Sequence, residues 1–111
     1  IVFEVSQPRN VSMATLRQRP DVLLIDGSLA SVPGAVKFWW MGLPPHHTFG
    51  CMAETILQTL ANDNQNHTGK IDQEFMGVVR GRGTSFGFPA AEFTSFNKKI
   101  SPEKFLEIFS R

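Results

Sequence analysis

A cysteine, a histidine and a glutamate lie close together in mid-chain, at spacings that suit nucleophilic chemistry. Cys51 stands in the segment TFGCMAETILQTL, residues 48–60, where Thr48 is expected to cap a helix that runs to about residue 61. The first turn of a helix has unpaired N–H groups and the positive end of the helix dipole, which favour a thiolate over a thiol. His47 is placed to accept the thiol proton, and Glu54 to orient a donor. We therefore predict Cys51, His47 and Glu54 as a candidate catalytic group.

Packing is the alternative role for the same cysteine. A free cysteine most often behaves as a small buried apolar residue. Met52 and Ile56, on the same expected helix, are apolar neighbours against which Cys51 could pack. The sequence alone leaves both interpretations open.

A second candidate site follows the strand expected at residues 21–26. That run, DVLLID, is almost continuously apolar, which is typical of a strand buried on both faces of a parallel sheet, and Gly27 ends it. In open α/β sheets, ligands bind at the carboxyl ends of the strands. We therefore predict Asp26 and Gly27 as ligand-binding positions.

The elements around these residues predict a small α/β fold. Residues 1–5 form a strand signal, a short helix ending before Pro20 follows, and the strand at 21–26 completes a βαβ pattern. We expect a third strand within residues 30–40 and helices over about 71–80 and 102–109, the last capped by Ser101. The prediction is a mainly parallel sheet of about three strands flanked by three or more helices.

Size and composition limit the classes of function. The 111 residues are 41% apolar and 19% charged, with a net charge of +1, which predicts one folded domain over residues 1–111. No basic stripe indicates nucleic-acid binding, and no apolar run reaches the ~20 residues of a membrane span. A single cysteine fits a reducing, cytoplasmic location. His46 and His47 lack further ligands at metal-site spacing, so we predict no metal.

Several segments, in this order, resemble the C-terminal part of the aldehyde-forming acyl-[acyl carrier protein] reductases, whose Rossmann domain is similar to that of shikimate dehydrogenases. They are EVSQPRNVS, PDVLLIDGSLASVPG, TFGCMAETILQTL and TSFGFPAAEFTSF. The resemblance implies a partial Rossmann-like domain, NADPH as the cofactor of a complete enzyme, and a nucleophile role for Cys51 in its Cys-Met-Ala-Glu context. It also implies that Gly27 and the loop after it face the nicotinamide.

The chain departs from that family in lacking a Gly-rich dinucleotide turn. Its glycine cluster at residues 81–87 follows a helix instead of joining a strand to a helix, so we expect a helix end and a turn there. We therefore expect a partial acyl-thioester reductase domain without catalysis or bound cofactor on its own. Its partners would be an acyl carrier protein or a missing N-terminal half.

The alternative function is an independently encoded, non-catalytic binding or assembly module, such as the product of a mobile gene cassette. In the complete fold of the resembled family, preceding strands would pair with the strand at residues 1–5, so we expect an unpaired edge there, and the chain is also rich in phenylalanine. We therefore expect a homodimer or a larger homo-oligomer.

Overall fold

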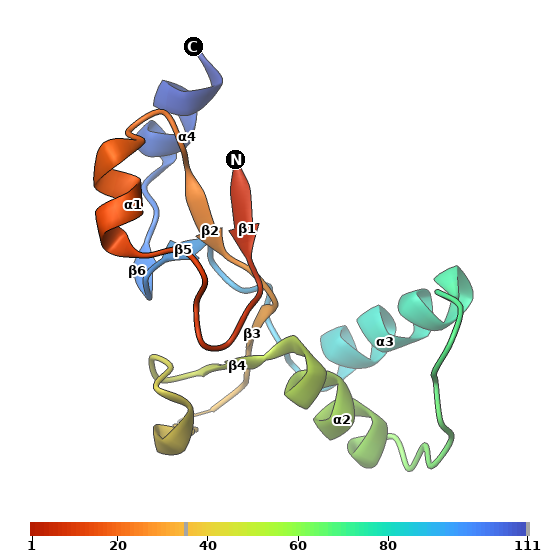
Figure 1. The fold of residues 1–111 in the computed structure, drawn as a ribbon. Helices are drawn as coiled ribbons and strands as arrows, with labels where there is room; N and C mark the ends of the chain where they lie inside the picture. Colours follow the sequence, from red (N-terminus) through yellow and green to blue (C-terminus); the bar gives the residue numbers. More distant parts are fainter. Residues whose placement is uncertain (35, 111) are drawn as a thin grey trace. The chain divides into compact units, whose positions relative to one another are not determined.

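The computed structural model describes residues 1–34 and 36–110, which form a mixed α/β structure (Figure 1). The described residues include four α-helices, one short 3-10 helix and three two-stranded sheets. Their contacts cluster in two compact units. Unit 1 comprises Ile1–Ser28 with Glu92–Arg111, and unit 2 comprises Leu29–Ala91. The α/β class is confirmed, whereas one domain over residues 1–111 stays a prediction.

Unit 1 is built around a pair of parallel strands. Its elements are β1 (Val2–Glu4), α1 (Met13–Gln18), β2 (Leu24–Asp26), β5 (Thr94–Ser95), β6 (Lys98–Lys99) and α4 (Pro102–Phe109). Val2 pairs with Leu24 and Glu4 with Asp26, so the predicted βαβ pattern is confirmed. The apolar run at β2 is buried, as expected for a strand covered on both faces. Leu23, Ile25 and Ile100 form its core.

The helix ends of unit 1 follow local capping rules. Ser12 accepts a hydrogen bond from the amide of Thr15 at the start of α1. Ser101 accepts one from the amide of Lys104 at the start of α4, with proline at the first helical position. The predicted bounds and cap of α4 are therefore confirmed.

Unit 2 contains a short antiparallel hairpin and two helices. Its elements are β3 (Leu29–Ser31), the 3-10 helix η1 (Trp39–Met41), β4 (His47–Phe49), α2 (Gly50–Leu60) and α3 (Gln73–Ser85). The third strand predicted within residues 30–40 is not an addition to the parallel sheet. Instead β3 pairs antiparallel with β4, and the described part of the run then leaves the extended conformation at Pro33 and Gly34. Position 35 of that run lies outside the described residues.

Two helix ends in unit 2 differ from the prediction. Thr48 is fully buried and belongs to β4, so Phe49 takes the N-cap position of α2 without a side-chain hydrogen bond. The helix predicted to end near residue 80 continues past Gly81 and Gly83 to Ser85, and the predicted turn follows at Phe86 and Gly87. Gly83 is buried, and a Cβ placed there would lie 3.9 Å from Leu57 of α2, so this glycine lies where the two helices pack.

Candidate functional site

Asp26, at the carboxyl end of β2, is the centre of a hydrogen-bonded cluster in unit 1. Its side chain is 3% exposed and forms an ion pair with Arg9. Thr94 Oγ1 donates to Oδ2 at 2.8 Å. The amides of Phe96 and Asn97, in the turn between β5 and β6, donate at 3.1 and 2.8 Å. Asp26 therefore joins β2, the loop after β1 and the β5–β6 hairpin.

The cluster also sets the charge state of this carboxylate. Burial raises the pKa of Asp26, but hydrogen bonds from Arg9, the Asn97 amide and Thr94 lower it more strongly, so its pKa lies below the usual value. The buried carboxylate is therefore kept ionised by groups of the chain itself.

Gly27 and Glu4 complete the same end of the sheet. The Gly27 amide donates to the Glu4 carbonyl at 2.8 Å. A Cβ on Gly27 would lie 2.6 Å from Val5 Cγ1, so a larger residue there would require Val5 to move. The Glu4 carboxylate accepts from the amides of Ser6, Asn10 and Val11, which fixes the loop after β1.

Both predicted cofactor-binding positions are thus engaged in contacts within unit 1. Asp26 uses both carboxylate oxygens on the chain's own donors, and Gly27 allows close approach of the segment after β1. A cofactor-binding role for Asp26 and Gly27 stays a prediction.

Cys51 lies in the first turn of α2, as predicted, and its side chain is exposed. The alternative of a buried packing role is therefore wrong. The thiol is exposed because Ala53 and Leu57 supply the buried side of this helix. The Cys51 carbonyl accepts from Thr55 Oγ1 at 2.9 Å.

The other two residues of the predicted catalytic group bond elsewhere. His47 lies on β4, where Nδ1 is 2.9 Å from the Pro45 carbonyl and Nε2 is buried without a hydrogen-bond partner. Glu54 accepts from Gln58 Nε2 at 3.0 Å, one turn further along α2. Among the described residues, no hydrogen bond joins either side chain to Cys51, and the catalytic role of the three stays a prediction.

A polar cluster in unit 2 was not predicted from the sequence. Arg82 Nη1 donates to Asp63 Oδ2 at 2.7 Å, and His67 Nε2 lies 3.3 Å from the same oxygen. The His67 ring stacks on Phe75 with centroids 3.5 Å apart. Hydrogen bonding by Arg82 holds the pKa of Asp63 below its usual value. The spacing of Asp63 and His67, four residues, is the only local signal in the sequence that could have indicated this pairing.

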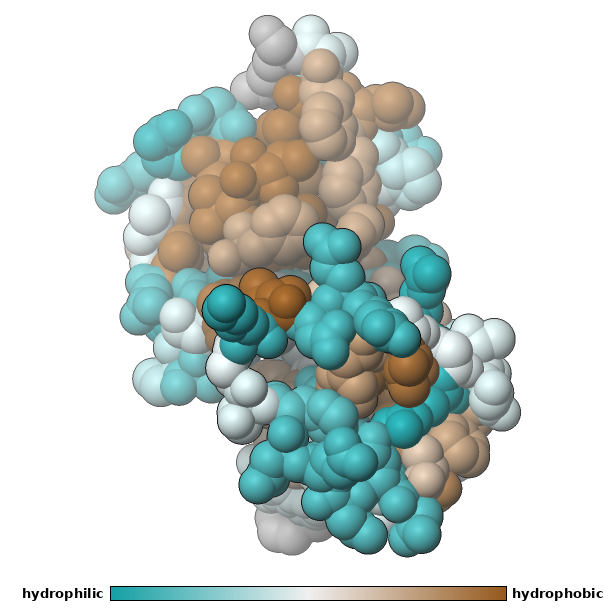
Figure 2. Space-filling model, turned by 90° about the vertical axis from the view of Figure 1, so that its right-hand side faces the viewer, coloured by the Kyte–Doolittle hydropathy of each residue, from teal (hydrophilic) through white to brown (hydrophobic). Residues whose placement is uncertain are grey.

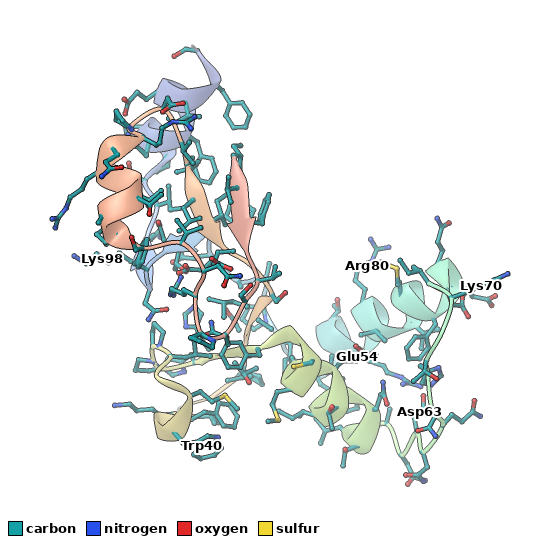
Figure 3. The ribbon with its side chains drawn as sticks, viewed as in Figure 1. Trp40, Glu54, Asp63, Lys70, Arg80 and Lys98 are labelled. Carbon is teal, nitrogen blue, oxygen red and sulfur yellow. The ribbon has the colours of Figure 1, made fainter. Side chains whose placement is uncertain are left out.

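An open cavity of about 510 Å³ lies beside this cluster. Its lining includes Glu54, His67, Lys70 and Phe75. Figure 3 shows Glu54 on α2, with Asp63 and Lys70 on the segment that leads from α2 to α3. The Asp63 contacts fasten that segment to α3, so we assign the cluster a structural role.

Unit 1 also carries an exposed apolar surface. Seven large apolar side chains of this unit are exposed on β1, on α4 or close to them: Ile1, Val2, Phe3, Val5, Phe93, Leu106 and Phe109. In Figure 2 brown atoms gather over unit 1, in the upper part of the view. We call these seven side chains the β1–α4 surface.

Within 1–34 and 36–110, no group of three or more His, Cys, Asp or Glu side chains could hold a metal ion. Across this described part of the chain, every helix is too short or too polar to span a lipid bilayer.

Comparison with known proteins found a short similarity to a much longer protein. The chain is 35% identical over 69 residues to the aminotransferase PigE of Serratia sp. (strain ATCC 39006). The matched region is 60% of this chain but only 8% of PigE. No protein-family model matches the chain, and no solved structure matches it.

This similarity overturns the function expected from the sequence. The expectation of a partial acyl-thioester reductase domain is wrong, because the similarity described above is to an aminotransferase. The resemblance rested on four short segments in their order, and the strand ends and helix starts that they contain are patterns that many α/β proteins share. NADPH and an acyl carrier protein followed from that resemblance alone, and we propose neither for this chain.

Proposed function

We propose that the chain is an association module that forms a homodimer through the free edge of β1. The observation that carries this proposal is the combination of a strand with one paired edge and a surrounding apolar surface. Exposed edge strands pair readily with further strands, and large exposed apolar patches are typical of interaction sites.

The hydrogen bonds of β1 define which edge is free. The Val2 amide donates to the Leu23 carbonyl, and the Glu4 carbonyl accepts from Gly27, both at 2.8 Å. Val2 and Glu4 therefore face β2. Because successive residues of a strand alternate, the backbone groups of Phe3 point to the opposite edge. Within the described residues, β2 is the strand that pairs with β1, so that edge is available to another strand.

The composition of β1 supports pairing with a second copy. Monomeric proteins commonly protect edge strands with lysine, proline or inward-pointing charges. The only charged residue of β1 is Glu4, which is buried and bonded to backbone amides. Two β1 strands related by a two-fold axis would pair antiparallel and extend the sheet from two strands to four. No like charges on these strands would repel each other in that pairing.

The similarity to PigE is compatible with a role in assembly. The matched region is a small part of that long protein, so it does not amount to an aminotransferase by itself. We propose that segments of this kind contribute contacts between parts of a larger assembly. Amino-group transfer remains a property of PigE and is not extended to this chain.

Sedimentation equilibrium over a wide range of micromolar concentrations tests the homodimer. Phe3→Lys places a charge at the free edge and is expected to weaken the dimer about ten-fold or more. Phe3→Pro removes the edge-facing amide and is expected to act in the same direction. Ile71→Lys is the matched control, because Ile71 is 85% exposed and lies in unit 2.

Two results would overturn the proposal. One is a wild-type chain that stays monomeric at the highest concentration. The other is a dimer that Phe3→Lys and Ile71→Lys weaken equally, since the contact would then not depend on β1.

A further inference from the structure

Unit 1 contains a second surface feature, on residues outside the β1–α4 surface. An open cavity of about 460 Å³ is lined by residues of α1, β2, β6 and the start of α4. Its volume lies within the range of ~300–1,000 Å³ that is usual for small-molecule sites. The lining combines apolar side chains with lysines, among them Leu16, Val22, Ile100, Lys98, Lys99 and Lys104.

The charged side chains that line this cavity have one sign. Of the described residues, no Asp or Glu lines it, whereas three lysines do. Lys99 pairs with Glu92 and Lys104 with Glu107, and both acidic partners lie outside the lining. Lys98 forms no ion pair among the described residues, so its ammonium group is available to an anion.

The apolar part of the cavity is continuous with the core of unit 1. Leu23, Leu24 and Ile100 are buried side chains that contribute to the lining. Leu16 of α1 is half-buried and lines the same cavity. The apolar surface still open to water in the lining belongs to half-buried side chains such as Leu16 and Val22, and an occupant that covered it would gain about 25 cal/mol for each Å² removed from water.

We propose that this cavity binds a single-chain fatty carboxylate. The alkyl chain would lie against Leu16 and Val22, over the buried Ile100, and the carboxylate would pair with Lys98. A purely apolar ligand would leave Lys98 without an ion-pair partner, and a small inorganic anion would leave the exposed part of the apolar lining in water. An amphipathic anion matches both parts of the lining.

Titration of the ¹⁵N-labelled chain with sodium decanoate below its micelle concentration tests this site. We expect saturable amide shifts that centre on Leu16, Lys98 and Ile100. Decanol, with the same chain and no charge, should bind more weakly, and acetate should give no saturable shifts. Shifts that centre in unit 2, or equal affinities for decanoate and decanol, would overturn the proposal.

Variants separate the two parts of the ligand. Lys98→Ala should weaken decanoate binding by about two- to five-fold, as expected for one partly exposed charge pair, and leave decanol binding unchanged. Leu16→Ala should weaken both ligands, because it removes apolar contact. Lys37→Ala is the matched control, because Lys37 is an exposed lysine of unit 2 and should change neither.

Other occupants give distinct results. Vesicles of anionic phosphatidylglycerol test a membrane surface, and a poly-glutamate peptide tests an acidic protein segment. Binding to either without binding to decanoate would overturn the proposal. Unchanged decanoate affinity in Lys98→Ala would also overturn it, because any binding would then be adventitious.

Discussion

Replacement of Asp26 by asparagine is expected to destabilise unit 1 strongly. Asp26 Oδ1 accepts from Arg9 and the Phe96 amide, and Oδ2 accepts from Thr94 and the Asn97 amide. Asparagine keeps one acceptor oxygen and replaces the other with an NH₂ group that can only donate. If the oxygen remains at Oδ1, the Thr94 hydroxyl can rotate to accept, but the Asn97 amide loses its partner.

The size of the effect follows from these lost interactions. A buried amide left without a partner costs about 1–3 kcal/mol, and the charge-assisted bond to Arg9 contributes about 1.5–3 kcal/mol. Breaking a buried ion pair by removing one partner typically costs about 3–5 kcal/mol. We therefore expect Asp26→Asn to lower the free energy of unfolding by about 3 kcal/mol near neutral pH.

The loss of stability in Asp26→Asn should also be smaller at low pH than at neutral pH. Because the pKa of Asp26 is lower in the folded protein than in the unfolded chain, its stabilising contribution is present above the unfolded value of about 3.9. That contribution is lost as the pH falls through the folded value. The difference in stability between wild type and Asp26→Asn should therefore shrink as the solution is acidified.

Urea unfolding followed by circular dichroism, at about pH 7 and about pH 3, measures this difference. Hydrogen exchange of the Phe96 and Asn97 amides, which donate to Asp26, should become faster in the variant. The control is Asp21→Asn, because Asp21 is exposed and pairs with Arg19 at the surface, where little change is expected. Wild-type stability in Asp26→Asn, or a difference that is the same at both pH values, would refute the role assigned to Asp26.

Three further predictions concern the Gly27–Val5 contact, the burial of Leu57 and the exposure of Cys51. Gly27→Ala should destabilise unit 1 by about 1 kcal/mol in urea unfolding, because the new Cβ would clash with Val5. Adding Val5→Ala should restore part of the lost stability. If it restores none, the clash with Val5 is not the cause. Leu57→Ala should cost about 2–5 kcal/mol, because Leu57 is a buried side chain of α2, and unchanged unfolding by tryptophan fluorescence would contradict that burial. Cys51 should react with a thiol reagent in the folded chain nearly as fast as in urea, because it is exposed, and labelling that requires unfolding would contradict this exposure.

Parts of the fold were predictable because the determining signals are local. The apolar run of β2, with a helix and a strand before it, predicted the parallel pairing of unit 1. Ser101 and Pro102 together predicted the start of α4. Such caps act within one turn of a helix, so a single short segment contains all the information needed.

Other parts depend on contacts between distant segments. Thr48 is a good helix cap by itself, but pairing of β4 with β3 places it in a strand and buries it. Gly83 would normally weaken a helix, but α3 continues through it at a position that faces Leu57. The partners of Asp26 in the β5–β6 hairpin are 68 to 71 residues away in sequence, so no local pattern could predict them.

The division of unit 1 between two distant stretches of sequence has a consequence for synthesis on the ribosome. Unit 2 is one continuous stretch, Leu29–Ala91, and all of its segments are available before Glu92 is added. Unit 1 needs Glu92–Arg111 to supply the donors that surround Asp26, so β1 and β2 must wait for them. Closing such a long loop is slow compared with local helix formation. We therefore expect unit 2 to become protected from proteases before unit 1 on a nascent chain.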